Sequence, residues 1–177
     1  PHLCMGCGGC ATVCPSGALG YAYPQVSDLG KRIKTLLTTY REAGGGDACL
    51  LFHNAADGRD LIAQLGRKGK GLPARMIPVE VFHVGALGLD LMLGAVALGA
   101  SQCIVVSGGA EAPEYLAALK TQMGFGGQIL QALGYTGAHF ALLEAAEWTR
   151  LESQVWALAP ARGCKPATFN LLNEKRT

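Results

Sequence analysis

Apolar residues fall into short continuous runs along this chain, and these runs alternate with segments of helical periodicity. The segment after residue 27 shows the helical spacing, because Leu29, Ile33 and Leu37 would share one face. Continuous apolar runs of five to seven residues bounded by glycine or polar residues are typical of strands buried on both faces. We expect strands over 48–53, 75–81, 102–106 and 139–143. We expect helices over 27–43, from 57 onward, over 85–99, and from 113 to about 124, with a break at 124–127 and a resumption over 128–133.

Strands that alternate with helices predict an α/β fold with a flavodoxin-like or Rossmann-like, mostly parallel sheet covered by helices on both faces. Pro78 cannot donate a ladder hydrogen bond, so its strand is expected to end near it or to lie at a sheet edge. The predicted organisation is a small ferredoxin-type cysteine loop over 1–24, a connecting helix over 25–46, a three-layer α/β domain over 47–146, and a C-terminal extension or linker over 147–177.

The first fourteen residues carry the most specific motif. Cys4, Cys7, Cys10 and Cys14, followed by Pro15, form the pattern C-x₂-C-x₂-C-x₃-C-P. This is the bacterial ferredoxin run that binds iron–sulfur clusters, so the four cysteines are predicted to be metal ligands of a [4Fe–4S] cluster. A structural zinc site is the alternative, although zinc sites more often pair two separated C-x₂-C knuckles.

The same run is one cluster ligand short. In two-cluster ferredoxins the first three cysteines hold one cluster and the fourth ligates the other. The remaining cysteines, Cys49, Cys103 and Cys164, do not stand in a Cys-Pro pair, and the first two read as core thiols. We therefore expect the chain to be a piece of a longer polypeptide that carries a partner cysteine run, with the cluster of this piece incomplete or lost.

The composition and net charge of the chain limit the kinds of molecule that it is expected to bind. Half of the residues are hydrophobic, 16% are charged, and the net charge is +2, so no strong field favours nucleic acid or anionic lipid. The apolar stretch over 85–100 is shorter than a membrane span, and no membrane insertion is expected. The chain has seven cysteines, an odd number, and four of them stand in a cofactor-type spacing. Because the sequence also shows no secretory signal, a cytoplasmic location is predicted. The predicted helix over 85–99 is rich in Gly and Ala, and its surface could pack against a second copy of the chain, so a homo-oligomer is a further possibility.

The loops after the predicted strands hold the other candidate site residues. Ser107, Gly108 and Gly109 follow the third strand, and their N–H groups are candidates for binding a flavin or nucleotide phosphate, although no glycine-rich fingerprint is present. A second candidate is a polar cluster for acid–base or metal chemistry, although caps and loop hydrogen bonds are the commoner role for such side chains. Its members would be His53, Asp57, His83 and Glu111. No residue is assigned a catalytic role.

Two resemblances follow from these motifs. Residues 1–24 resemble a bacterial-type 4Fe-4S ferredoxin module. Residues 45–145 resemble the delta subunit of methyl-viologen-reducing hydrogenase, of the hydrogenase and heterodisulfide reductase iron–sulfur family, through strand–helix order and the stretch 97–106. That family places [2Fe–2S] cysteines in strand-end loops, whereas the loops here at 54–56, 78–80 and 107–111 hold none. The resemblance implies a larger multi-cluster ferredoxin-like parent, in which this domain has lost its cluster and serves as a docking scaffold.

These observations favour an electron-transfer module of an oxidoreductase system without catalytic activity of its own. Its expected partners are redox proteins or other domains of the same polypeptide. A flavin- or nucleotide-binding oxidoreductase domain is the first alternative, and a zinc-bound or metal-free interaction scaffold is the second.

Overall fold

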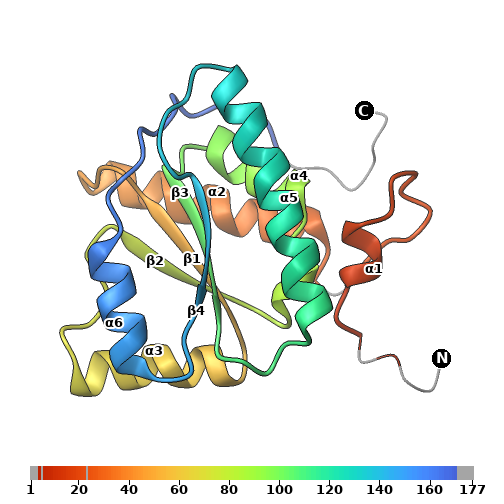
Figure 1. Ribbon diagram of the computed structural model, residues 1–177. Helices are drawn as coiled ribbons and strands as arrows, with labels where there is room; N and C mark the ends of the chain where they lie inside the picture. The colour runs from red at the N-terminus through yellow and green to blue at the C-terminus, as the bar shows by residue number, and fades with distance from the viewer. Residues whose placement is uncertain (1–3, 5, 23, 171–177) are drawn as a thin grey trace.

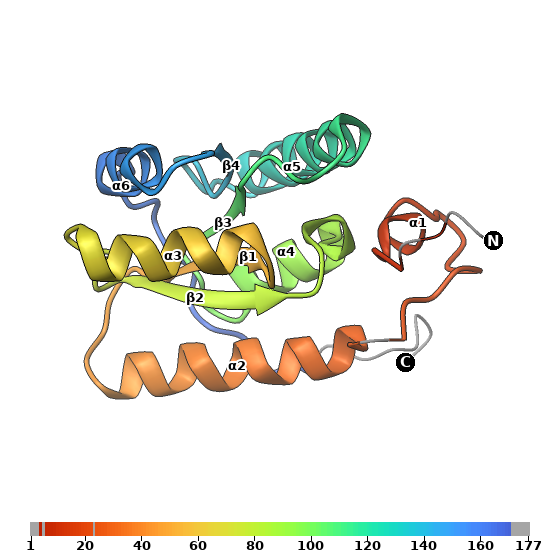
Figure 2. The same ribbon diagram turned by 90° about the horizontal axis from the view of Figure 1, so that it is seen from below.

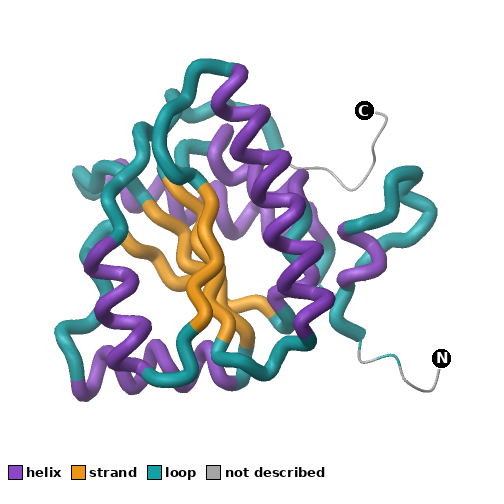
Figure 3. Tube along the Cα trace, viewed as in Figure 1, coloured by secondary structure: helices purple, strands orange, loops and turns teal. Residues whose placement is uncertain are grey.

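The computed structural model describes residues 4, 6–22 and 24–170. In this part of the chain four parallel strands form a single sheet at the centre of the molecule, surrounded by helices (Figures 1 and 3). The predicted α/β class with a parallel sheet is confirmed. The strands are β1 (Cys49–Asn54), β2 (Met76–Val81), β3 (Gln102–Ser107) and β4 (Phe140–Glu144), and their order in the sheet is β2-β1-β3-β4.

The helices cover both faces of this sheet, as the continuous apolar strands require. Leu50 and Phe52 of β1 point to one face, where α2, α4 and α5 pack, and Leu51 points to the other face, where α3 and α6 pack. Figure 2 shows these layers from below. The helices are α1 (Gly9–Thr12), α2 (Val26–Glu42), α3 (Asp57–Lys68), the 3₁₀ turn η1 (Val84–Ala86), α4 (Leu89–Ala97), α5 (Pro113–Ala132) and α6 (Trp148–Ala157).

The chain changes direction across the sheet between β1 and β3. From β1 it passes over α3 to β2 at one edge, and it then returns over α4 on the opposite face to β3. This order matches the first four strands of a flavodoxin-like sheet, whose ligands bind outside the carboxyl ends of the two strands at the switch point. The loops after β1 and β3 therefore lie where a sheet of this order binds ligands. Pro78 lies in β2, which is an edge strand as the missing N–H predicted.

Two predicted helices differ from the observed ones. The helix expected over 85–99 begins only at Leu89, because Gly85 belongs to η1, where its N–H donates to Nδ1 of His83 at 2.9 Å. The expected break at 124–127 is wrong, since α5 continues through it without interruption. Gly126 is buried, and a Cβ there would lie 2.7 Å from Cε2 of Phe140. Close packing against the sheet thus outweighs the low helix propensity of glycine.

The flanking segments of the predicted α/β domain also pack onto the sheet. Ile33 and Leu37 of α2 are fully buried in the core beneath one face, and Leu151 and Val155 of α6 are buried on the other. Beyond α6 the chain runs without regular structure to residue 170 and bonds back to α4 through Ala167, whose N–H donates to the carbonyl of Ala97 at 2.8 Å. Among the described residues, no helix combines the length and apolar character needed to cross a membrane.

Candidate metal centre

The cysteine loop is wound by glycines in left-handed conformations. Gly6 has φ 68° and Gly8 has φ 79°, values that an L side chain rarely adopts. Two hydrogen bonds hold the turn: the hydroxyl of Tyr21 donates to the carbonyl of Gly6 at 2.7 Å, and the N–H of Ala11 donates to the carbonyl of Gly8 at 3.0 Å. The loop then enters the short helix α1, which carries Cys10. The backbone therefore turns tightly between the cysteines.

The four thiols have different surroundings. Cys7 is buried, Cys4 and Cys10 are exposed, and Cys14 is half-buried. The hydroxyl of Ser16, followed by the backbone at Leu19, stabilises the thiolate of Cys14 and lowers its pKa to about 6. Cys14 is thus a thiolate near neutral pH, which is the form that ligates metals.

A tyrosine from the α/β domain packs against the cysteine loop beside Cys7. Tyr115 lies in the first turn of α5, and its ring packs where a Cβ on Gly9 would be 3.3 Å from two ring carbons and 3.6 Å from Sγ of Cys7. A hydrogen bond to Cys7, and then the charges of Cys7, Cys10 and Cys4, raise the pKa of the Tyr115 hydroxyl. Cys14 is not among the groups that act on this hydroxyl. The ring of Tyr115 therefore packs beside Gly9 and Cys7.

Further contacts dock the cysteine loop onto the carboxyl end of the sheet, where α1 lies beside α5 in both ribbon views (Figures 1 and 2). The hydroxyl of Thr12 donates to the carbonyl of Gly9 at 2.9 Å and lies 3.3 Å from that of Gly85 in η1. Gly8 lies so close to η1 that a Cβ on it would be 3.0 Å from Cβ of Ala86. Between the loop and α5 is a mainly apolar cavity of about 240 Å³, lined among others by Cys10.

The chemistry of the loop suits an iron–sulfur cluster, although the ligand set is incomplete within the domain. Within the described ranges, no three His, Cys, Asp or Glu side chains are gathered closely enough to hold one metal ion. The other three cysteines lie away from the cysteine loop. Cys49 and Cys103 are fully buried at the amino ends of β1 and β3, and Cys164 contacts the carbonyl of Val96. Burial raises the pKa of Cys49 to about 11 and raises that of Cys103 further, so both are inert core thiols.

At the sheet's switch point a buried asparagine joins the loops after β1 and β3. The Nδ2 group of Asn54 donates to Oε1 of Glu111 at 2.7 Å and to Oδ1 of Asp57, while its Oδ1 accepts from the N–H of Gly58 at 2.8 Å. The hydroxyl of Ser107 donates to the second oxygen of Glu111 at 2.6 Å. Side chains of the protein itself therefore satisfy one another at the position where flavodoxin-like sheets bind ligands.

The predicted phosphate loop lies against this network. The N–H of Gly109 donates to the hydroxyl of Ser107 at 3.3 Å, and the N–H of Ala110 donates to Oδ2 of Asp57 at 3.3 Å. Gly108 packs directly on the same carboxylate, leaving no room for a Cβ. Asp57 thus occupies the place of an anion at this loop, and binding of a flavin or nucleotide phosphate by residues 107–109 stays a prediction.

The expected grouping of two histidines with two carboxylates is only half present. Asp57 and Glu111 meet on Asn54, as described above, whereas the histidines point to other places. The buried ring of His53 bonds the carbonyl of Asn54 through Nδ1 at 2.9 Å. His83 instead packs edge-on against Tyr115, with ring centroids 5.3 Å apart. Histidine and carboxylate therefore do not form a shared acid–base site here.

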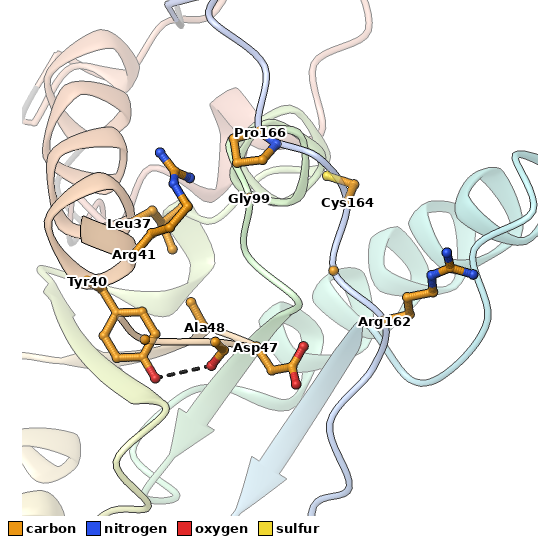
Figure 4. A pocket seen from close by; sticks show the side chains of 12 residues that line it. Leu37, Tyr40, Arg41, Asp47, Ala48, Gly99, Arg162, Cys164 and Pro166 are labelled. Carbon is orange, nitrogen blue, oxygen red and sulfur yellow. Dashed lines mark hydrogen bonds between the residues drawn. The ribbon is translucent and has the colours of Figure 1, made fainter. Parts of the chain in front are cut away.

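A second cavity, of about 300 Å³, lies at the opposite end of the sheet, between α2 and the C-terminal coil (Figure 4). Arg41 and Arg162 lie on opposite sides of it, with Asp47 between them. Tyr40 closes one wall, with its hydroxyl donating to the carbonyl of Gly46 at 3.1 Å. The split placement of the two guanidinium groups and the intervening carboxylate give this cavity no clear preference for an anion.

Comparison with known families bears on the cysteine loop. Residues 1–20 match the 4Fe-4S binding domain family. This match supports a ferredoxin-type module in this part of the chain. Electron transfer through an iron–sulfur cluster is the function that this match indicates. No curated protein matches the chain.

Sequence reasoning missed two residues that organise these sites. Tyr115 was not singled out from the sequence, although its place in the first turn of the helix that follows β3 put it at the carboxyl edge of the sheet. Asn54 was regarded as part of a loop. Its position as the last residue of a buried strand, followed three residues later by Asp57, was the available signal of a capping role.

Proposed function

We propose that the N-terminal loop binds a [4Fe–4S] cluster through Cys4, Cys7 and Cys10 and passes single electrons. The spacing of the cysteines and the family match over residues 1–20 carry this proposal. Cys14 is left out of the set because the fourth cysteine of a bacterial run ligates a different cluster. The missing ligand would come from a second cysteine run in the same polypeptide or in a partner.

In this proposal the α/β domain is a docking scaffold and not a redox relay. Its cysteines are buried at the end of the sheet away from the cysteine loop, or lie against α4 in the case of Cys164. The strand-end loops that would carry [2Fe–2S] ligands in the hydrogenase delta-subunit family contain Asn54, Pro78 and Ser107 instead. The domain presents to the cysteine loop a rigid wall, made of η1 and the first turn of α5.

The module would serve an oxidoreductase system in the cytoplasm, where thiolates and clusters stay reduced. Its partners would be redox proteins or neighbouring domains that receive or supply electrons. No acid–base residue is needed, because the protein contributes distance, burial and hydrogen bonds to the sulfurs while the cluster supplies the redox chemistry.

The test is anaerobic reconstitution of the chain with iron and sulfide, in the presence of 2-mercaptoethanol as an external thiolate for the iron that lacks a protein ligand. We expect iron and acid-labile sulfide in nearly equal amounts and a visible absorbance that bleaches with dithionite. Cys7→Ser should lose most of the bound iron, whereas Cys164→Ser, its matched control, should retain it. Zinc binding without sulfide, or equal iron in both variants, would overturn the proposal.

A further inference from the structure

We infer that two copies of this chain complete each other's clusters. Cys4, Cys7 and Cys10 of one copy and Cys14 of the second copy would ligate one [4Fe–4S] cluster, and the reverse set would ligate another. The inference rests on the proposed function, since it names the source of the ligand that the cysteine loop lacks. The partner is a second copy of this chain, and both clusters would lie at the interface between the copies.

The count of thiols points to a second copy. The first three cysteines of a bacterial run bind one cluster and the fourth binds another, so one chain lacks one ligand and has one, Cys14, left over. Cys49 and Cys103 are fully buried at the amino ends of their strands, and Cys164 contacts the carbonyl of Val96, so these thiols do not make up the difference. Two copies together supply eight thiols of the run, four for each of two clusters.

The structure of the single chain agrees with an incomplete site. In the part of the chain that the structure describes, no three His, Cys, Asp or Glu side chains are grouped closely enough to hold a metal ion. Cys4 and Cys10 are exposed, and Cys14 is half-buried. These thiols are therefore open to a ligand or a metal that is shared with another molecule.

The position of Cys14 lets it reach a neighbouring molecule. Figures 1 and 2 show α1 and the turn after it at one side of the molecule, outside the layers of the α/β domain. Every residue from 15 to 20 in this turn is exposed. Sγ of Cys14 lies 3.5 Å from the hydroxyl of Ser16, a residue of the same turn. A turn that projects in this way can contact the cysteine loop of a second copy without disturbing the core.

Apolar side chains beside Cys14 favour contact with protein over contact with water. Val13, which directly precedes it, is 58% exposed, and Leu19, at the far end of the turn, is 55% exposed. The mainly apolar cavity of about 240 Å³ is lined by both Cys10 and Val13. Burial of such surface against a second copy is favourable. In a two-fold dimer the same surface is covered on both copies, so each Cys14 would meet the loop of the other.

The experiment is native mass spectrometry of the chain after anaerobic reconstitution with iron and sulfide, without an external thiolate. We expect a dimer that carries two [4Fe–4S] clusters. Added 2-mercaptoethanol should convert it to a monomer with one cluster, because this thiolate replaces Cys14 as the fourth ligand. Cys14→Ser should be monomeric, since it removes the shared ligand. Cys164→Ser is the matched control and should remain a dimer with two clusters, because that thiol lies against α4.

A mixture of two defective variants tests the exchange of ligands directly. Cys7→Ser breaks the set of three cysteines but keeps Cys14, whereas Cys14→Ser keeps the set of three. Neither variant alone can complete a cluster with protein ligands. Mixed in equal amounts and distinguished by tags of different mass, they should form a heterodimer with one cluster, which is half of the loading of the parent dimer. Far-ultraviolet circular dichroism of each variant should match that of the parent.

Three results would overturn the inference while leaving the proposed function intact. They are a parent chain that carries its cluster as a monomer, a Cys14→Ser variant that dimerises as the parent does, and a mixture that holds no more cluster than the two variants separately. Failure of every preparation to bind iron and sulfide, with or without 2-mercaptoethanol, would overturn the proposed function as well.

Discussion

Replacement of Asn54 by aspartate tests the network at the switch point of the sheet. The parent amide donates to the carboxylates of both Asp57 and Glu111, and a carboxylate in its place can donate to neither. The substitution keeps the size of the side chain and an oxygen that can accept from the N–H of Gly58. Its effect therefore reports on charge and hydrogen bonding, with little contribution from packing.

The magnitude follows from the geometry. Each hydrogen bond to a charged group contributes about 1.5–3 kcal/mol, and two are lost. Two like charges about 4 Å apart repel by about 4 kcal/mol at an effective dielectric constant of about 20. The two lost hydrogen bonds alone amount to about 3–6 kcal/mol. The introduced carboxyl can escape much of the repulsion by taking up a proton, so we expect Asn54→Asp to lower the free energy of unfolding by about 3–6 kcal/mol at pH 7.5. That is a large part of the total stability of a typical domain, about 5–15 kcal/mol.

The sign of the pH dependence is also determined. Neighbouring carboxylates raise the pKa of the introduced carboxyl in the folded state above its unfolded value. The folded variant therefore binds more protons than the unfolded one, and the deficit relative to the parent should shrink as the pH falls toward 5.

The assay is urea unfolding followed by far-ultraviolet circular dichroism, for parent and variant at pH 7.5 and pH 5.5. Gln131→Glu on the exposed side of α5 adds the same charge and serves as the control, with an expected change below about 0.5 kcal/mol. A loss below about 1 kcal/mol in Asn54→Asp, or a deficit that does not change with pH, would refute the described network.

Three further predictions concern other parts of the fold. Gly126→Ala should lower the unfolding free energy by about 1–3 kcal/mol through overpacking, whereas Gly124→Ala, in open space on the same helix, should raise it by about 0.5–1 kcal/mol; urea midpoints that move together would contradict the packing of α5. Cys49 and Cys103 should resist iodoacetamide in the native protein and react fully in urea, because both are buried and their thiols have raised pKa values; native labelling detected by mass spectrometry would disprove their placement. Burial lowers the pKa of His53, so the unfolded state binds more protons below about pH 6.5 and stability should fall on acidification through that range. His53→Gln should show a smaller loss between pH 7.5 and 5.5, and an equal loss would exclude His53 as the cause.

Sequence alone determined the class of fold and the chemistry of the cysteine loop. Both depend on local spacing: apolar runs with turn residues between them indicate buried strands, and four cysteines at short intervals before a proline indicate a cluster loop. The edge position of β2 followed from Pro78 for a similarly local reason, the absence of one N–H group. Strand ends shifted by one residue, whereas the helix expected from residue 85 begins four residues later, because the ends of elements depend on neighbours outside them.

Tertiary structure alone decided which distant residues meet. Asn54 and Glu111 are 57 positions apart, and they are joined because β1 and β3 are neighbours in the sheet with their carboxyl ends at one edge. The ring of Tyr115 packs against Gly9 because the cysteine loop docks on η1 and α5, which no spacing along the chain encodes. The continuity of α5 through Gly126 likewise depends on the ring of Phe140, a contact that exists only after the sheet has formed.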